Sequence, residues 1–172
     1  MLLIVGLGNP GSQYQNNRHN VGHLFIDYLI KQLRITNSGL KLYKTDCYMN
    51  QSGKFVKKII RNSSSAIDQL IIVHDDLDIP LGKFKIQKGT GPLLHNGIES
   101  IEKALRTKDF LRVRIGIDNR LPRRNESEGG TQTNWVDGES YVLQNFRPEE
   151  KKIIADIFPK IYHRLKTDLE IL

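Results

Sequence analysis

The sequence predicts an α/β fold: a single domain with a mixed, mostly parallel sheet flanked by helices. Its 172 residues are enough for one hydrophobic core and short for two, so we treat residues 1–172 as one domain. Short apolar runs alternate with longer segments in which apolar residues recur every three or four positions. Strands that alternate with helices are typical of a largely parallel sheet with some antiparallel pairing.

The first predicted elements are a strand, a helix and a second strand. Leu2–Val5 is a short apolar run typical of a buried strand. A helical pattern begins at Val21 and continues to Leu33, and Asn20 is placed to cap it. Leu40–Tyr43 alternates as a strand does.

The second predicted helix is strongly two-sided. It follows Asn50–Gly53 and is broken by Asn62–Ser65. Its apolar side carries Phe55, Val56, Ile59 and Ile60, and its other side carries Lys54, Lys57, Lys58 and Arg61.

The central part of the chain supplies three more strands and a helix. Leu70–Val73 is an apolar run typical of a strand buried on both faces, and the polar cluster His74–Asp78 follows at its carboxyl end. Lys83–Gln87 alternates and is expected to be half-exposed. A helix is predicted from about Asn96, and Leu111–Ile117 alternates strictly as a further strand.

The last part is predicted to be a loop and a helix. Asp118–Ser140 is polar and rich in Gly, Asn and Arg, which indicates a long surface loop. Pro148 begins a helical pattern, which Pro159 is expected to kink or split.

The basic residues indicate a polyanionic partner. The segment from Lys83 to Arg124 holds eleven basic and four acidic residues, a net +7 that equals the excess of the whole chain. Concentrated Lys and Arg displace counterions from phosphates, although a merely solvated basic surface would look the same. The lone Cys47 predicts a reducing compartment and no structural zinc, and no apolar run is long enough to span a membrane.

The segment Gly6–Gly11 spells G-x-G-x-x-G, which raises the possibility of a dinucleotide site. In such a site the helix starts inside the motif and an acidic residue ends the second strand. Here the helical pattern starts only at Val21, and Asp27 lies inside the helix. We therefore expect a tight strand exit that presents Asn9, with no cofactor.

Polar side chains follow several strand ends, where α/β sheets place their chemistry. Asn9, His19, His74–Asp75 and His95–Asn96 all hold such positions. A His can act as a base near neutral pH, an Asp can polarise it, and Asn amides can donate to an oxyanion. This set favours hydrolysis by an activated water. A hard-metal site on Asp75 and the nearby acids is the alternative, which we disfavour.

The chain carries an ordered series of motifs that resembles bacterial-type peptidyl-tRNA hydrolases. The motifs are GLGNPG (6–11) with Tyr14, RHNVG (18–22), MNQSG (49–53), HDDLDIPLG (74–82), HNG (95–97), RVRIGI (112–117) and YVL (141–143).

The resemblance implies a monomeric esterase without metal or cofactor that releases peptides from peptidyl-tRNA, in the cytoplasm or in a mitochondrion. It implies His19 as catalytic base and Asp75 as its carboxylate partner. Its implied substrate-binding residues are Asn9, Tyr14, Asn50, His95 and Asn96. Its implied tRNA-binding residues are Lys83, Lys85, Arg112 and Arg114.

The main alternative is a non-enzyme, an RNA-binding module of the splicing-factor type on the same fold. The full set of implied catalytic residues favours the enzyme. Gly89–Leu94 differs from the glycine-rich loop usual in the family and keeps the alternative open.

Overall fold

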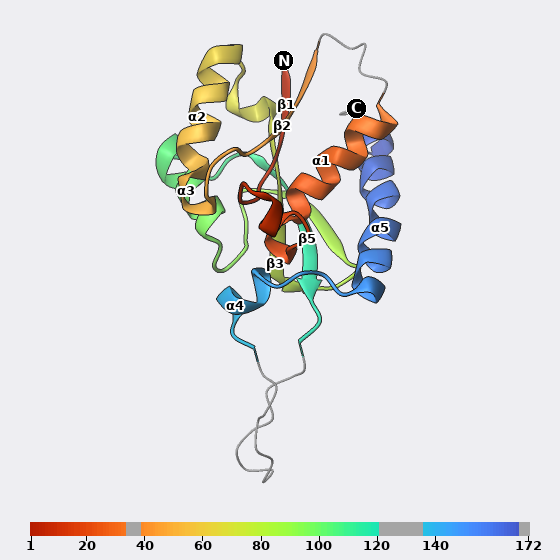
Figure 1. Cartoon of the computed structure of the whole chain (residues 1–172). Helices are drawn as coiled ribbons and strands as arrows, with labels where there is room; N and C mark the ends of the chain where they lie inside the picture. Colours follow the sequence, from red (N-terminus) through yellow and green to blue (C-terminus); the bar gives the residue numbers. More distant parts are fainter. Residues whose placement is uncertain (34–38, 121–135, 169–172) are drawn as a thin grey trace.

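The structure, a computed structural model, describes residues 1–33, 39–120 and 136–168, and contains one five-stranded sheet (Figure 1). The strands are β1 (Leu2–Gly6), β2 (Leu40–Lys44), β3 (Leu70–Pro80), β4 (Phe84–Lys88) and β5 (Leu111–Asp118). The helices are α1 (Val21–Gln32), α2 (Ser52–Ser63), α3 (Asn96–Leu105), α4 (Gly138–Val142) and α5 (Pro148–His163).

The sheet is mixed and mostly parallel, as predicted. Its strand order is β2-β1-β3-β5-β4, and only β4 runs antiparallel, against β5. Helices flank both faces. One core packs α1 and α5 against residues such as Ile71, Val73 and Ile115, and the other packs α2 and α3 against residues such as Leu70 and Ile72. Because successive residues of a strand face opposite sides, β3 contributes to both cores.

The strand β3 is longer than its apolar run predicts. It was expected to end near Val73, but it continues through the polar cluster to Pro80. Pairing with β1 stops at Gly6 and Val73, while β5 still pairs alongside through Asp76. The polar residues after Val73 therefore pair with β5 along one edge of β3, and β1 no longer pairs with them along the other edge.

Three other predictions need correction. The short helix α4 begins at Gly138, inside the segment predicted to be a loop, and the carboxylate of Asp137 caps it by accepting from the Ser140 N–H at 2.9 Å. Residues 121–135 of that predicted loop lie outside the described residues. The helix α5 runs through Pro159 without a break, and Asn20 precedes α1 without capping it by its side chain.

No helix in the described parts of the chain combines the length and the apolar character needed to cross a bilayer.

Candidate active site

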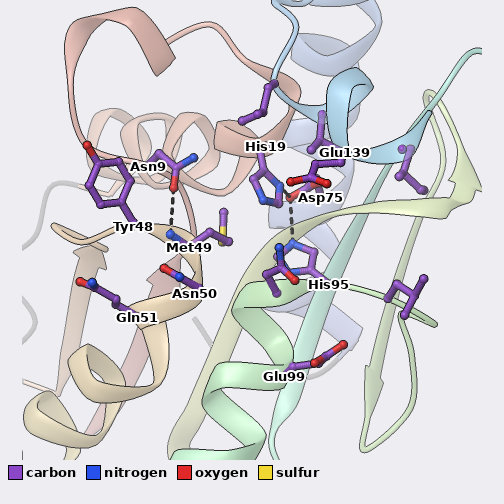
Figure 2. A pocket seen from close by; sticks show the side chains of 16 residues that line it. Asn9, His19, Tyr48, Met49, Asn50, Gln51, Asp75, His95, Glu99 and Glu139 are labelled. Carbon is purple, nitrogen blue, oxygen red and sulfur yellow. Dashed lines mark hydrogen bonds and ion pairs between the residues drawn. The ribbon is translucent and has the colours of Figure 1, made fainter. Parts of the chain in front are cut away.

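A pocket of about 770 Å³ opens at the carboxyl ends of β1 and β3 (Figure 2). Six of the predicted site residues line it: Asn9, His19, Asn50, Asp75, His95 and Asn96. They come from the turn after β1, the turn before α1, the turn before α2, the middle of β3 and the start of α3. The structure thus brings together residues that are up to 87 positions apart in the chain. Tyr14 does not line this pocket.

His19 and Asp75 form a buried, directed pair. His19 lies in the 3-10 turn Arg18–Asn20, and its Nδ1 is 2.9 Å from Oδ1 of Asp75. Because a carboxylate accepts, Nδ1 of His19 carries the proton and its Nε2 keeps a lone pair. No described residue hydrogen-bonds that Nε2, which is therefore available to act as a base toward a ligand in the pocket.

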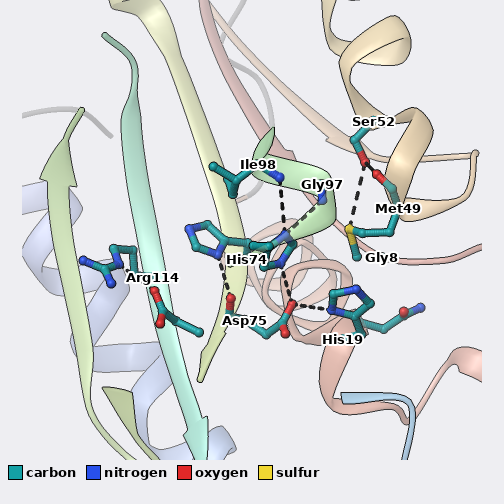
Figure 3. A network of polar contacts seen from close by, with 12 residues as sticks. Gly8, His19, Met49, Ser52, His74, Asp75, Gly97, Ile98 and Arg114 are labelled. Atoms are coloured by element: carbon teal, nitrogen blue, oxygen red, sulfur yellow. Dashed lines mark hydrogen bonds and ion pairs between the residues drawn. The ribbon is translucent and has the colours of Figure 1, made fainter. Parts of the chain in front are cut away.

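His95 hydrogen-bonds the same carboxylate oxygen of Asp75 (Figure 2) that accepts from His19 (Figure 3). Its Nε2 is 2.9 Å from Oδ1 of Asp75, and its Nδ1 accepts the backbone N–H groups of Gly97 and Ile98 at 3.1 and 3.3 Å. The ring is the N-cap of α3. Both ring nitrogens are occupied, so His95 fixes Asp75 and does not contact substrate through them. The expectation that His95 binds substrate stays a prediction, and the geometry of its ring favours a positioning role.

The charges in this cluster shift the pKa values of its members. Burial lowers the pKa of His19, but the charge and hydrogen bond of Asp75 outweigh it, so the pKa is raised overall. Burial likewise raises the pKa of Asp75, yet His19 and His95 hold it far below its ordinary value. Asp75 is therefore ionised at neutral pH and stabilises a protonated His19.

His74 is buried beneath the pair and stays neutral. Its Nδ1–H donates to the backbone carbonyl of Asp75 at 2.7 Å, which fixes the backbone next to the Asp75 carboxylate. Burial and the nearby His95 keep the pKa of His74 well below its ordinary value. Its Nε2 has no hydrogen-bond partner in the structure.

The turn after β1 positions Asn9 by three hydrogen bonds. The backbone N–H of Asn9 donates to Oδ1 of Asn20, and Nδ2 of Asn20 donates to the Asn9 carbonyl, both at 2.9 Å. Oδ1 of Asn9 accepts the Met49 N–H at 2.8 Å. The Nδ2 group of Asn9 is left to donate into the pocket, which Asn50 and Asn96 enter from exposed positions.

A buried ion pair supports the turn that carries His19. Nη2 of Arg18 lies 2.7 Å from Oε2 of Glu150, and both side chains are at most 2% exposed. The Arg18 guanidinium also lies 4.0 Å from the centre of the Tyr141 ring. This contact ties the start of α1 to α4 and α5. Sequence reasoning missed it, because Arg18 and Glu150 are 132 positions apart.

The predicted tRNA-binding residues divide into two groups. Lys83 and Lys85 are exposed, at the start of β4. Arg112 and Arg114 are 1% and 6% exposed and are paired with Glu102 and Asp76, at 2.9 and 2.6 Å. The expectation that these two arginines meet a phosphate is not supported, because each is enclosed and already neutralised.

Among the described residues, three that line this pocket have atoms that one metal ion could bind together. His19, Asp75 and His95 offer atoms within 4.8 Å of one another. Their geometry favours hydrogen bonding instead: Nδ1 of His95 accepts two N–H groups, so its Nε2 carries a proton and cannot donate a lone pair. The three acids of the polar cluster do not converge either, since Asp76 binds Arg114 and Asp78 accepts the Leu93 N–H.

Two features of the pocket wall were not predicted. The helix α4 contributes Glu139, which lies beside His19 in Figure 2, together with Val142. Leu94 lines the opposite rim and is 83% exposed. The motif around Tyr141 was a signal for the first feature, but no periodicity marked a helix of only five residues.

Together, the α/β sheet and the buried His19–Asp75 pair define an α/β protein with a candidate acid–base site, and the described residues that line its pocket include no Ser, Cys, Thr or Lys. The model of the family described as peptidyl-tRNA hydrolase matches residues 3–170. The chain belongs to the peptidyl-tRNA hydrolase family.

Individual relatives agree with this assignment. The chain is 37% identical to the peptidyl-tRNA hydrolase of Aquifex aeolicus, over 98% of this chain and 90% of that one. It is 37% identical to that of Thermodesulfovibrio yellowstonii, over 91% and 86%. The crystal structure of peptidyl-tRNA hydrolase from Acinetobacter baumannii superposes with a TM-score of 0.76 at 29% identity, covering 92% of this chain and 83% of that one.

Proposed function

We propose that the protein hydrolyses the ester bond that joins a peptide to tRNA. The observation that carries the proposal is the His19–Asp75 pair, buried at 2.9 Å with Nε2 of His19 directed to a pocket lined by three asparagines. This arrangement provides a base and amide donors at one place. The family and the named relatives support the same substrate.

In the proposed mechanism, Nε2 of His19 accepts a proton as an oxygen nucleophile attacks the ester carbonyl. The nucleophile is water, or water assisted by the neighbouring ribose hydroxyl. Asp75 stabilises the imidazolium that forms, and His95 keeps the carboxylate in place. The amide groups of Asn9, Asn50 and Asn96 bind the peptide and the developing oxyanion. His19 then returns the proton to the leaving ribose oxygen.

For the rest of the substrate, we propose that Lys83 and Lys85 bind tRNA phosphate. Lys83 and Lys85 stand on either side of Phe84 in the sequence. Phe84 of β4 pairs with Ile115 of β5, and Ile115 pairs with Asp75 of β3, so the two lysines lie two strands away from Asp75. Two strand spacings correspond to roughly 10 Å. We further propose that the chain acts as a monomer in a tRNA-containing compartment, the cytoplasm or a mitochondrion, without metal.

The test is release of N-acetyl-aminoacyl groups from tRNA in the presence of a chelator. The wild type should release them, and His19→Ala should lose at least 10²-fold in rate, the usual contribution of a general base. Binding of uncharged tRNA should stay within twofold, roughly the scatter of a neutral surface change. The matched control is His163→Ala, which alters an exposed histidine of α5.

The competing RNA-binding module makes the opposite prediction. If the wild type binds tRNA but releases nothing, and His19→Ala behaves like His163→Ala, the chain is a binding protein on this fold. A rate restored only by added divalent metal would instead revive ligation by His19, Asp75 and His95.

A further inference from the structure

The structure divides the cations of the basic segment Lys83–Arg124 into those with an acidic partner and those without one. Most described cations of the basic segment Lys83–Arg124 have acidic partners. The pairs are Lys88–Asp109, Lys103–Glu99, Lys108–Glu102, Arg112–Glu102, Arg114–Asp76 and Arg120–Asp118. A cation with an acidic partner attracts a polyanion less strongly than an unpaired one, so the exposed cations without such a partner matter most for binding.

The helix α2, in contrast, carries exposed cations for which the described residues provide no acidic partner. Lys54, Lys57, Lys58 and Arg61, here called the α2 stripe, are all exposed and follow the spacing i, i+3, i+4, i+7 of one helix face. The helix contains no acidic residue, and no ion pair or hydrogen bond of these four side chains is found among the described residues. Like charges at this spacing destabilise a helix. We therefore expect an anionic partner that offsets the repulsion between these four cations.

The α2 stripe begins at the pocket. The turn Met49–Gln51 contributes Asn50 to the pocket wall and leads directly into α2. The start of the helix is fixed against α3, where the Gly53 N–H donates to Oγ of Ser100 at 3.0 Å. From Lys54 to Arg61 the helix rises by roughly 10 Å. The helix α2, which carries the stripe, therefore starts next to the pocket residue Asn50 and leads away from it (Figure 1).

We propose that the α2 stripe binds phosphates of the tRNA body while the ester lies in the pocket. This rests on the proposed function and adds a second cationic surface to Lys83 and Lys85. The alternation of β4 places Lys85 on the same side of the sheet as α2 and α3, because Phe84 and Ile86 pack into the other core. One substrate could thus contact the stripe, the pocket and the β4 lysines.

The composition of the stripe favours RNA over a membrane. Helices that lie on lipid insert apolar side chains next to their cations. In α2 the apolar residues Val56 and Ile59 are buried in the core shared with α3, and no large apolar residue of the helix is exposed. The exposed face offers charge alone, which suits a phosphate backbone.

The test compares two variants that lose the same charge. The first changes the four residues of the stripe to Gln. The control changes four exposed lysines, Lys31, Lys152, Lys160 and Lys166, which lie on α1, on α5 and in the turn after α5. Binding of uncharged tRNA is measured against salt concentration, and kcat/KM is measured for N-acetyl-aminoacyl-tRNA and for the same ester on the 3′-terminal trinucleotide alone.

Loss of about two phosphate contacts should lower the salt slope by about 1.8 and weaken tRNA binding about 30-fold at roughly 0.15 M salt. The kcat/KM for full-length substrate should fall in parallel. The control should change binding less than about threefold, and the trinucleotide ester, which lacks the tRNA body, should be hydrolysed by all three proteins at similar rates.

Three results would overturn the inference: an unchanged salt slope, an equal loss in the control, or an equal loss on the trinucleotide ester. So would binding to anionic vesicles that depends on the stripe while tRNA binding does not. The proposed function fails separately, if the wild type releases no peptide; the stripe variant would then still lose tRNA binding.

Discussion

The charge of Asp75 should set the pH at which the protein works. In the folded protein the pKa of His19 is raised, because Asp75 outweighs the effect of burial. In Asp75→Asn the charge is removed and burial remains, so the pKa of His19 should fall below its ordinary value of about 6.5. Only neutral His19 can accept a proton, so activity rises as pH increases through this pKa. The midpoint of the rate profile should therefore lie above about 6.5 in the wild type and below it in the variant.

The size of this shift follows from the contact. The bonded atoms are 2.9 Å apart, which places the centres of charge at roughly 4 Å, where two unit charges interact by about 4 kcal/mol at an effective dielectric constant of 20. One pKa unit corresponds to about 1.4 kcal/mol, so the shift is at most about three units. We expect the midpoint to fall by about one to three units. The plateau rate should also fall, by about 10² or more, because the imidazolium is no longer stabilised.

The assay is kcat/KM for N-acetyl-aminoacyl-tRNA between about pH 5 and 8, with an NMR titration of the His19 ring in parallel. The matched control is Asp78→Asn, which changes an exposed carboxylate three positions along the same strand and should leave the midpoint in place. A midpoint in Asp75→Asn that stays at or above the wild-type value would refute this account of the pair.

Four further variants test the surroundings of the pair and the predicted phosphate-binding residues. His95→Asn should keep an N-cap on α3 and cost less than about 1 kcal/mol in urea unfolding, yet lower kcat, because Asp75 loses one of its two donors. Arg18→Met leaves Glu150 buried without its partner and should cost about 3–5 kcal/mol, whereas retained stability would show that the ion pair does not hold the His19 turn. Arg114→Met should likewise lower the free energy of unfolding, because Asp76 loses its partner. Lys85→Gln should weaken tRNA binding and leave the free energy of unfolding unchanged. If instead Arg114→Met weakened tRNA binding and Lys85→Gln lowered stability, Arg114 would again be a candidate phosphate ligand.

Periodicity predicted the strands and the long helices, because each has one clear repeat of apolar residues. It could not predict how far β3 extends, since the residues after Val73 are polar and are held by pairing with β5. It also missed α4, whose five residues are too few to show a helical repeat and which is held by Asp137 and by the contacts of Tyr141.

The prediction that Arg112 and Arg114 bind phosphate did not anticipate their ion pairs. Strict alternation in β5 correctly placed both arginines on one face. What covers that face depends on other elements: Glu102 comes from α3 and Asp76 from β3. A pattern along one strand reports the side on which a residue lies, but not whether that side meets solvent or a buried acid.

The candidate catalytic residues were predicted as a set, but the hydrogen bonds between them were not. Sequence reasoning paired His19 with Asp75 and left His95 as a substrate ligand. The structure shows that one oxygen of Asp75 accepts from both histidines, because the N-terminus of α3 approaches β3 at that point. The packing there is close: a Cβ on Gly97 would lie 2.6 Å from Sδ of Met49 and 3.0 Å from Cδ1 of Leu7, so these side chains would have to shift.

The G-x-G-x-x-G segment is explained by the same kind of packing. A Cβ on Gly6 would overlap the backbone of Gly22, so this glycine allows α1 to start directly against the end of β1. Gly11 has φ 108°, a region that other residues rarely adopt, and turns the chain toward Arg18–Asn20. Between them Asn9 uses its backbone groups to bind Asn20. The backbone groups of Asn9 that would face a pyrophosphate thus form hydrogen bonds within the chain. The turn presents the side-chain amide of Asn9 to the pocket, and the residues that follow it present His19, the proposed base.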